Sequence, residues 1–159
     1  MDDIKNNHKI LVTGGCGFIG SNFIRYLLDK YPSVSIINLD SLTYAGNLSN
    51  LKDIKDDDRY LFVKGDIRDK ELVDSIIDSC NVVVHFAAES HVDRSIGDAG
   101  EFILTNVYGT YTLLQSALEA YNSNSLLKKF VMISTDEVYG DIPKGQSSLE
   151  GDILLPRNP

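Results

Sequence analysis

Two adjacent carboxylates follow a hydroxyl in the run Thr135-Asp136-Glu137, and this cluster is the strongest candidate for chemistry in the 159-residue chain. Neighbouring carboxylates in different environments can hold different protonation states near neutral pH, so that one donates a proton while the other accepts one. A helix-capping run has the same composition, because capping hydroxyls and acids concentrate where a helix begins. From the residues alone, acid–base chemistry and helix capping explain this cluster equally well.

Three evenly spaced glycines, Gly14, Gly17 and Gly20, follow the apolar run Ile10-Leu11-Val12. Glycines in a turn between a strand and a helix let the backbone approach a pyrophosphate, whose charge is met by the helix N-terminus. The spacing alone is weak evidence, because it is also typical of a flexible turn. An amphipathic segment follows the glycines, and an acid, Asp40, stands twenty residues beyond Gly20. Together these features predict a dinucleotide-binding turn.

Asp40 and Asp66 follow the second and third predicted strands. A carboxylate at the position of Asp40 accepts hydrogen bonds from the adenosine ribose and repels a 2′-phosphate. Because Ser41-Leu42-Thr43 offers no Arg or Lys to hold such a phosphate, NAD is favoured over NADP. The alternative for Asp40 is a turn residue after a strand. Asp66 is placed to reach the adenine with Ile67 packed on the ring, but an Asp turn or helix cap explains it equally well.

Small residues follow the fourth predicted strand, in Ala87-Ala88-Glu89-Ser90, and would let the backbone lie close to the nicotinamide half of a dinucleotide. Ligands of an open parallel sheet bind beyond the carboxyl ends of its strands, where the Thr135 cluster is also expected. His91, which comes next, is more often a hydrogen-bonded structural residue than a proton carrier. His8 and His85 give no functional signal.

Five short apolar runs would position these residues. Several are continuous enough for burial on both faces, and they predict strands at 9–13, 34–39, 59–64, 81–86 and 129–134. The segments between them predict helices at 18–30, 48–55 (the weakest), 69–79 and 98–122. This alternation predicts the α/β class, with a Rossmann-like, doubly wound parallel sheet covered by helices on both faces.

The longest predicted helix, 98–122, carries both an apolar stripe and a glycine. Gly109 costs about 1 kcal/mol relative to Ala in a helix, so we expect it to serve close packing. From Gly140 to Pro159 the sequence lacks periodicity and predicts a mobile loop. The stripe consists of residues at three- and four-residue steps: Ile103, Val107, Tyr111, Leu114, Leu118 and Tyr121.

The composition is that of an ordinary globular domain, with 43% hydrophobic and 24% charged residues, which excludes intrinsic disorder. A net charge of −8 argues against binding to nucleic acid, which requires a basic face. Cys16 and Cys80 show no metal-ligand spacing, so no metal site is predicted and reduced thiols are expected. No apolar run approaches the ~18 residues of a membrane span. The polar N-terminus does not resemble a signal peptide, and we expect a cytoplasmic protein.

The sequence resembles the extended short-chain dehydrogenase/reductase superfamily and, within it, the dTDP-glucose 4,6-dehydratase family. The glycine motif is common to the superfamily. Thr135-Asp136-Glu137 is far more specific, because related epimerases and decarboxylases resemble it around Val138-Tyr139-Gly140 but generally lack the Asp-Glu pair. The resemblance covers 9–140 and includes, besides these motifs, Asp40 through Leu48, Ala87 through Ser95 and Thr105-Asn106.

The resemblance implies an internal redox cycle on dTDP-glucose with NAD as cofactor. The C4 hydride passes to NAD+, water is eliminated across C5 and C6, and the hydride returns to C6 to give the 4-keto-6-deoxy sugar nucleotide. Asp136 would be the acid toward the C6 hydroxyl, Glu137 the base toward C5 and Thr135 the partner of the C4 oxygen, with Ser90 also near the substrate. The implied NAD site consists of Gly14, Gly17, Phe18, Ile19, Gly20, Asp40, Ser41, Leu42, Thr43, Asp66, Ile67, Ala87, Ala88, Glu89, Ser90 and Thr105.

One part of the family pattern is missing. The family's hydride step uses a YxxxK pair, and the pairs Tyr26/Lys30 and Tyr60/Lys64 have this spacing but fall in a helix and a strand away from the nicotinamide. We therefore expect an incomplete Rossmann domain, 1–159, that is the N-terminal portion of such an enzyme and has no turnover alone. The family's intact enzymes are homodimers that pack through the equivalent of helix 98–122, so its stripe is expected to be exposed and to promote association. The alternatives are an NAD-binding module without activity and a sibling UDP-sugar dehydratase or epimerase.

Overall fold

The computed structural model describes residues 7–97, 99–123 and 126–157. Five parallel strands form a single sheet in the order β3-β2-β1-β4-β5. The predicted Rossmann-like sheet is therefore confirmed, and each strand lies within two residues of its predicted bounds. The strands are β1 (Lys9–Thr13), β2 (Ser35–Asp40), β3 (Tyr60–Lys64), β4 (Val82–His85) and β5 (Lys129–Met132).

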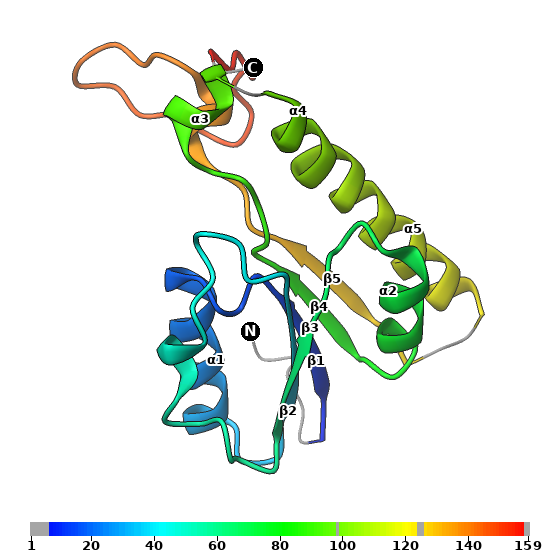
Figure 1. The fold of residues 1–159 in the computed structure, drawn as a ribbon. Coiled ribbons are helices and arrows are strands. Elements are labelled where there is room, and N and C mark those ends of the chain that lie inside the picture. Colours follow the sequence, from blue (N-terminus) through cyan, green and yellow to red (C-terminus); the bar gives the residue numbers. More distant parts are fainter. Residues whose placement is uncertain (1–6, 98, 124–125, 158–159) are drawn as a thin grey trace.

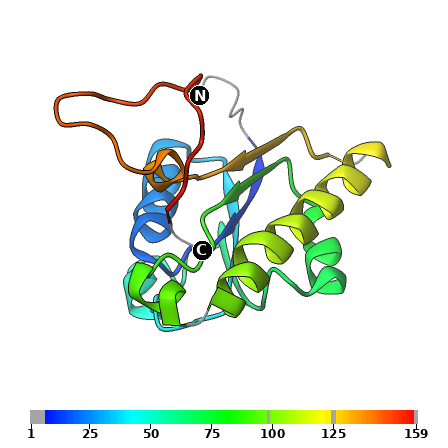
Figure 2. The same ribbon diagram turned by 90° about the horizontal axis from the view of Figure 1, so that it is seen from above.

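Helices cover both faces of the sheet. In Figure 1, α1 (Phe18–Lys30) lies on one face, whereas α2 (Lys70–Ile77) and α5 (Thr110–Asn122) lie on the other. The view from above in Figure 2 shows the same three layers. The predicted helix at 48–55 is wrong in extent, because only a 3-10 turn, η1 (Leu48–Leu51), forms there. No helix was expected at α3 (Val92–Gly97).

Each strand of the central sheet sends alternate side chains to two separate cores. In β1, Leu11 faces the cluster under α2 and α5, which also contains Val83 and Leu113. Ile10 and Val12 face the cluster under α1. All five of these side chains are completely buried. Burial on both faces explains why the strand sequences are continuous apolar runs rather than alternating ones.

The long helix predicted at 98–122 is divided into three parts. A short α4 (Ala99–Phe102) passes into a π-helical segment, η2 (Ile103–Gly109), and then into α5. The predicted start, residue 98, lies outside the described residues. Gly109 packs closely, as expected, because a Cβ there would lie 2.6 Å from Cδ1 of Ile67 in the loop after β3.

The apolar stripe of this helix faces away from the sheet. Its six residues, Ile103, Val107, Tyr111, Leu114, Leu118 and Tyr121, are between 46% and 67% exposed. The opposite face of α5 is buried and carries mostly small or short side chains, which allow the helix to lie close to the sheet. The prediction that the stripe is exposed is confirmed.

Residues 140–157 contain no helix or strand, which agrees with the irregular loop expected there. The segment nevertheless folds back on the turn that follows β5, because the Leu155 N–H donates to the Val138 carbonyl at 3.0 Å. This contact brings Pro156 to the carboxyl edge of the strands. The last predicted loop residues, 158–159, lie outside the described part. Within that part no helix is long and apolar enough to cross a membrane.

Candidate functional site

A cavity of about 980 Å³ opens at the carboxyl ends of all five strands. The strand order reverses between β1 and β4, and a doubly wound sheet binds its ligands at such a point. Loops from widely separated parts of the sequence meet there. The predicted site residues that line the cavity are Gly14, Gly17, Phe18, Ile19, Gly20, Asp40, Ser41, Thr43, Asp66, Ile67, Ala87, Ala88, Glu89, Ser90, Thr105, Thr135, Asp136 and Glu137.

The glycine turn leaves no room for side chains at two positions. Gly14 has φ = +70°, and a Cβ there would lie 2.6 Å from the backbone nitrogen of Ala87. A Cβ on Gly20 would lie 2.4 Å from the Gly14 carbonyl oxygen. Gly17 precedes α1 and supplies no side-chain cap, so amides of the first helical turn are available to a ligand. The arrangement suits an anion at the N-terminus of α1.

Asp40 is buried, and its carboxylate accepts hydrogen bonds from two loops, the glycine turn and the loop after β2. Its Oδ2 accepts from the Cys16 N–H at 2.9 Å, and its Oδ1 accepts from the Leu42 N–H at 2.8 Å. The turn interpretation is therefore correct locally, and the carboxylate also lines the cavity. Leu42 differs from expectation, because it does not line the cavity. Its backbone has φ = +57°, and its side chain packs on the cluster under α1.

Asp66 is held by an arginine that the sequence interpretation missed. Arg68 Nη2 and Nε donate to Asp66 Oδ2 at 2.7 and 3.0 Å, and Arg68 Nη1 lies 3.3 Å from Glu101 Oε2. Burial raises the pKa of the Asp66 carboxyl, but the hydrogen bonds from Arg68 outweigh it and place the pKa below its usual value. Asp66 is not the cap of α2, because Asp69 accepts the Leu72 N–H. Asp66 therefore presents an ionised carboxylate to the cavity.

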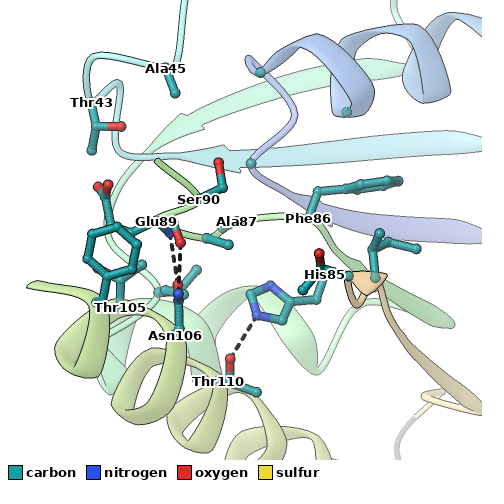
Figure 3. Close-up of a pocket in the computed structure, with 18 of the residues that line it drawn as sticks. Thr43, Ala45, His85, Phe86, Ala87, Glu89, Ser90, Thr105, Asn106 and Thr110 are labelled. Carbon is teal, nitrogen blue, oxygen red and sulfur yellow. Dashed lines mark hydrogen bonds between the residues drawn. The ribbon is translucent and has the colours of Figure 1, made fainter. Parts of the chain in front are cut away.

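The loop after β4 is fixed by the π-helical segment. Asn106 Oδ1 accepts from the Glu89 N–H, and Asn106 Nδ2 donates to the Glu89 carbonyl, both at 2.8 Å (Figure 3). On the other side of the cavity mouth, Tyr44 Oη donates to Glu89 Oε2 at 3.0 Å. Glu89 thus links the loops after β2 and β4 to the long helix. Asn106 was noticed only within a resembling motif, with no role assigned.

His85 lines the cavity, although no motif or spacing in the sequence pointed to it. Its ring lies between two hydroxyls, with Thr13 Oγ1 2.7 Å from Nδ1 and Thr110 Oγ1 3.0 Å from Nε2. Burial lowers the pKa of His85 to about 4, so the imidazole is neutral near pH 7. The available signal was its position at the carboxyl end of a central strand, where ligands bind.

Thr135 caps the 3-10 turn η3 (Asp136–Tyr139). Thr135 Oγ1 accepts from the Glu137 N–H at 3.3 Å. Asp136 and Glu137 are exposed and line the cavity together with Thr135. The capping interpretation and a chemical role are therefore compatible, because the cap places both carboxylates at the cavity.

Neither YxxxK-spaced pair is at the cavity. Lys30 Nζ bonds to Tyr26 Oη on the exposed side of α1. Tyr60 Oη accepts from Asn38 Nδ2 at 2.8 Å under the sheet. None of the described residues that line the cavity is a tyrosine or a lysine. No group of metal-ligating side chains is gathered anywhere in the described ranges.

A family model described as GDP-mannose 4,6 dehydratase matches residues 11–159. Two curated relatives are the low-salt glycan biosynthesis protein Agl12 of Haloferax volcanii and the dTDP-glucose 4,6-dehydratase of Streptomyces niveus. The first is 56% identical over 94% of this chain and 46% of its own length. The second is 52% identical over 86% of this chain and 40% of its own. The chain thus spans less than half the length of these relatives.

Solved structures share the fold closely. The dTDP-glucose 4,6-dehydratase DesIV of Streptomyces venezuelae, with NAD and TYD bound, superposes with a TM-score of 0.87 and is 51% identical over 94% of this chain and 46% of that structure. The UDP-glucose 4-epimerase of Thermotoga maritima, with UDP-glucose, superposes with a TM-score of 0.80 but is only 30% identical, again over 94% of this chain and 45% of that structure. The epimerase comparison shows that overall shape alone does not separate these two activities.

Proposed function

The chain belongs to the GDP-mannose 4,6-dehydratase family, and from this premise we propose that it is the NAD-binding part of a dTDP-glucose 4,6-dehydratase. The observation that carries the proposal is one cavity lined by both the glycine turn and Thr135-Asp136-Glu137. The first suits a dinucleotide, and the second provides an acid and a base beside it. The dTDP-glucose 4,6-dehydratases among the relatives are about half identical to this chain, whereas the epimerase of Thermotoga maritima is 30% identical.

The residues of the cavity fit NAD. The open first turn of α1 would receive the pyrophosphate. Gly14 lets the turn before that helix rest directly on the Ala87 backbone, where a Cβ has no room. Asp40 would accept hydrogen bonds from the adenosine ribose. The ionised Asp66 would accept from the adenine amino group with Ile67 against the ring. When bound, NAD+ supplies an acceptor for the sugar's C4 hydride and later returns that hydride.

Three residues would carry the elimination. Asp136 donates a proton to the C6 hydroxyl, which leaves as water, while Glu137 accepts the C5 proton. Thr135 donates a hydrogen bond to the C4 oxygen, and Ser90 lines the same cavity from the opposite loop. The elimination removes the C6 hydroxyl and the C5 proton as one water and leaves a C5–C6 double bond. Addition of the hydride at C6 and of a proton at C5 would then give the 4-keto-6-deoxy derivative. Such a product belongs to deoxysugar biosynthesis.

The remaining parts of the proposal concern turnover by this chain, the oligomeric state of the complete enzyme and the compartment. We expect the 159 residues to bind NAD without turnover, because no described residue that lines the cavity is a tyrosine or lysine able to deprotonate the C4 hydroxyl. The exposed stripe of η2 and α5 supports a homodimer in the complete enzyme. Two buried, unpaired thiols fit a reducing compartment, the cytoplasm.

Calorimetric titration of NAD into the chain tests the first part of the proposal. Saturable binding is expected to be strongly weakened in Asp40→Ala and unchanged in Asp53→Asn, a half-exposed aspartate paired with Arg25 away from the cavity. In the complete enzyme, Glu137→Gln should block release of the 4-keto product from dTDP-glucose. Unchanged product formation by that variant would refute the assigned roles.

A further inference from the structure

His85 joins three elements in the wall of the cavity, which His85 and Thr110 both line. Its Nδ1 lies 2.7 Å from the Thr13 hydroxyl. Its Nε2 lies 3.0 Å from the Thr110 hydroxyl (Figure 3). Thr13 ends β1, His85 ends β4 and Thr110 begins α5. All three residues are buried, with exposed fractions of 0%, 3% and 8%. A single side chain therefore couples the two central strands to the helix that follows the π-helical segment.

One arrangement of the hydrogens uses every donor of this network. Thr13 Oγ1 accepts the Ala87 N–H at 3.3 Å, and its own hydroxyl hydrogen can be donated to His85 Nδ1. The ring hydrogen then belongs on Nε2, where it is donated to Thr110 Oγ1. A protonated ring would bring a second N–H to Thr13 Oγ1 and leave the hydroxyl hydrogen without this acceptor. The neutral ring is thus the form that the neighbours accommodate.

The network ends at the place where the two ligand-binding loops touch. A Cβ on Gly14 would lie 2.6 Å from the nitrogen and 2.7 Å from the Cα of Ala87, so the glycine turn rests on the Ala87 backbone. The next residues, Ala88 and Glu89, line the nicotinamide side of the cavity. A displacement of Ala87 would therefore move these residues relative to the glycine turn.

We propose that His85 is a positioning residue, held neutral with its hydrogen on Nε2, that aligns the loop after β4 with the glycine turn and so preorganises the nicotinamide half of the site. This inference rests on the proposed function, because it concerns the same NAD site. ADP needs only the part of the cavity over β1 to β3. NAD also needs the aligned loop after β4. A comparison of ADP and NAD affinity therefore separates the adenosine half of the site from the nicotinamide half.

Thr110→Val tests the proposal, since it removes the hydroxyl and keeps the ring and the side-chain shape. Thr112→Val is the matched control, because Thr112 is also buried in α5 but its hydroxyl donates to the Tyr108 carbonyl of the same helical region. Loss of about one hydrogen bond should weaken NAD binding about five- to tenfold in Thr110→Val. ADP binding should change less than about twofold, and the control should change neither.

His85→Phe should lower the NAD/ADP affinity ratio further, and if it fails to fold, Thr110→Val still decides. Nitrogen NMR of the His85 ring in the wild-type chain should show a protonated Nε2 and an unprotonated Nδ1. A proton on Nδ1, or equal weakening of NAD and ADP by Thr110→Val, would overturn the positioning role. If the wild-type chain binds NAD and Thr110→Val leaves the ratio of NAD affinity to ADP affinity unchanged, only the positioning role of His85 is refuted. If wild type binds no NAD, the proposed function fails and the inference with it.

Discussion

Asp40→Asn removes a charge and one hydrogen-bond acceptor while it keeps the shape of the side chain. In the native chain both carboxylate oxygens are occupied, Oδ2 by the Cys16 N–H at 2.9 Å and Oδ1 by the Leu42 N–H at 2.8 Å. Asparagine has one acceptor oxygen and one NH2 group. Whichever way the amide is turned, one of the two backbone N–H groups faces another donor. Because Asp40 is only 7% exposed, water cannot readily replace the lost acceptor.

The cost of leaving one such N–H unsatisfied is about 1–3 kcal/mol. For a domain of this size each kcal/mol lowers Tm by about 2–4 °C, so Tm should fall by about 2–12 °C. The variant also loses a charged acceptor for the proposed ribose hydroxyls. A hydrogen bond to a charged group contributes about 1.5–3 kcal/mol, which corresponds to about ten- to hundredfold weaker NAD binding.

Urea and thermal denaturation followed by circular dichroism measure the loss of stability, and calorimetric titration with NAD measures the loss of affinity. Asp53→Asn is the control, since its carboxylate is half exposed and pairs with Arg25 Nε at 2.8 Å on the surface. A surface pair of this kind contributes about 0–1 kcal/mol, and NAD affinity should not change. If Asp40→Asn unfolds at the same urea concentration as wild type, the two amides have other acceptors and the reasoning is wrong.

Four further outcomes are expected. Gly20→Ala should abolish NAD binding in calorimetry, because its Cβ would lie 2.4 Å from a backbone carbonyl of the glycine turn. Burial raises the pKa of Cys16 and of Cys80 to about 11, so neither thiol should react with Ellman's reagent at pH 8 until urea unfolds the chain. Burial lowers the pKa of His85 from 6.5 to about 4, so the unfolded chain binds the extra proton between these values. The free energy of unfolding should therefore fall by up to about 3 kcal/mol as pH drops through that window, and His85→Phe should remove this dependence. Leu118→Lys, on the exposed stripe, should reduce association in sedimentation experiments and change the free energy of unfolding by less than about 0.5 kcal/mol.

The helical layer shows where prediction from the sequence succeeds and where it stops. The residues of 103–121 that recur at helical spacing do share one face, because that geometry is local. Whether the face is covered is a tertiary property, and here it points to solvent. The π-helical segment also makes contacts with residues far away in the sequence, since Asn106 bonds to Glu89 and Gly109 packs on Ile67. No periodicity in the sequence distinguishes it from an ordinary helix.

The candidate site divides in the same way. The glycine turn, Asp40 and Thr135-Asp136-Glu137 could be selected from the sequence, because each combines a distinctive composition with a place at the end of a strand. Whether the Thr135 cluster caps a turn or does chemistry could not be decided locally, and the structure shows that it caps η3 at the cavity wall.

By itself the sequence determined the five strands, their order of alternation with helices and the edge of the sheet where ligands bind, because apolar runs and glycines act over a few residues. Only the tertiary structure decided which polar groups meet at that edge. His85 bonds to residues 72 and 25 positions away, and Arg68, which holds Asp66, also bonds to Glu101, 33 positions beyond Arg68. Side-chain hydrogen bonds reach about 3 Å in space without regard to sequence separation, so their partners are set by the packing of the sheet and helices.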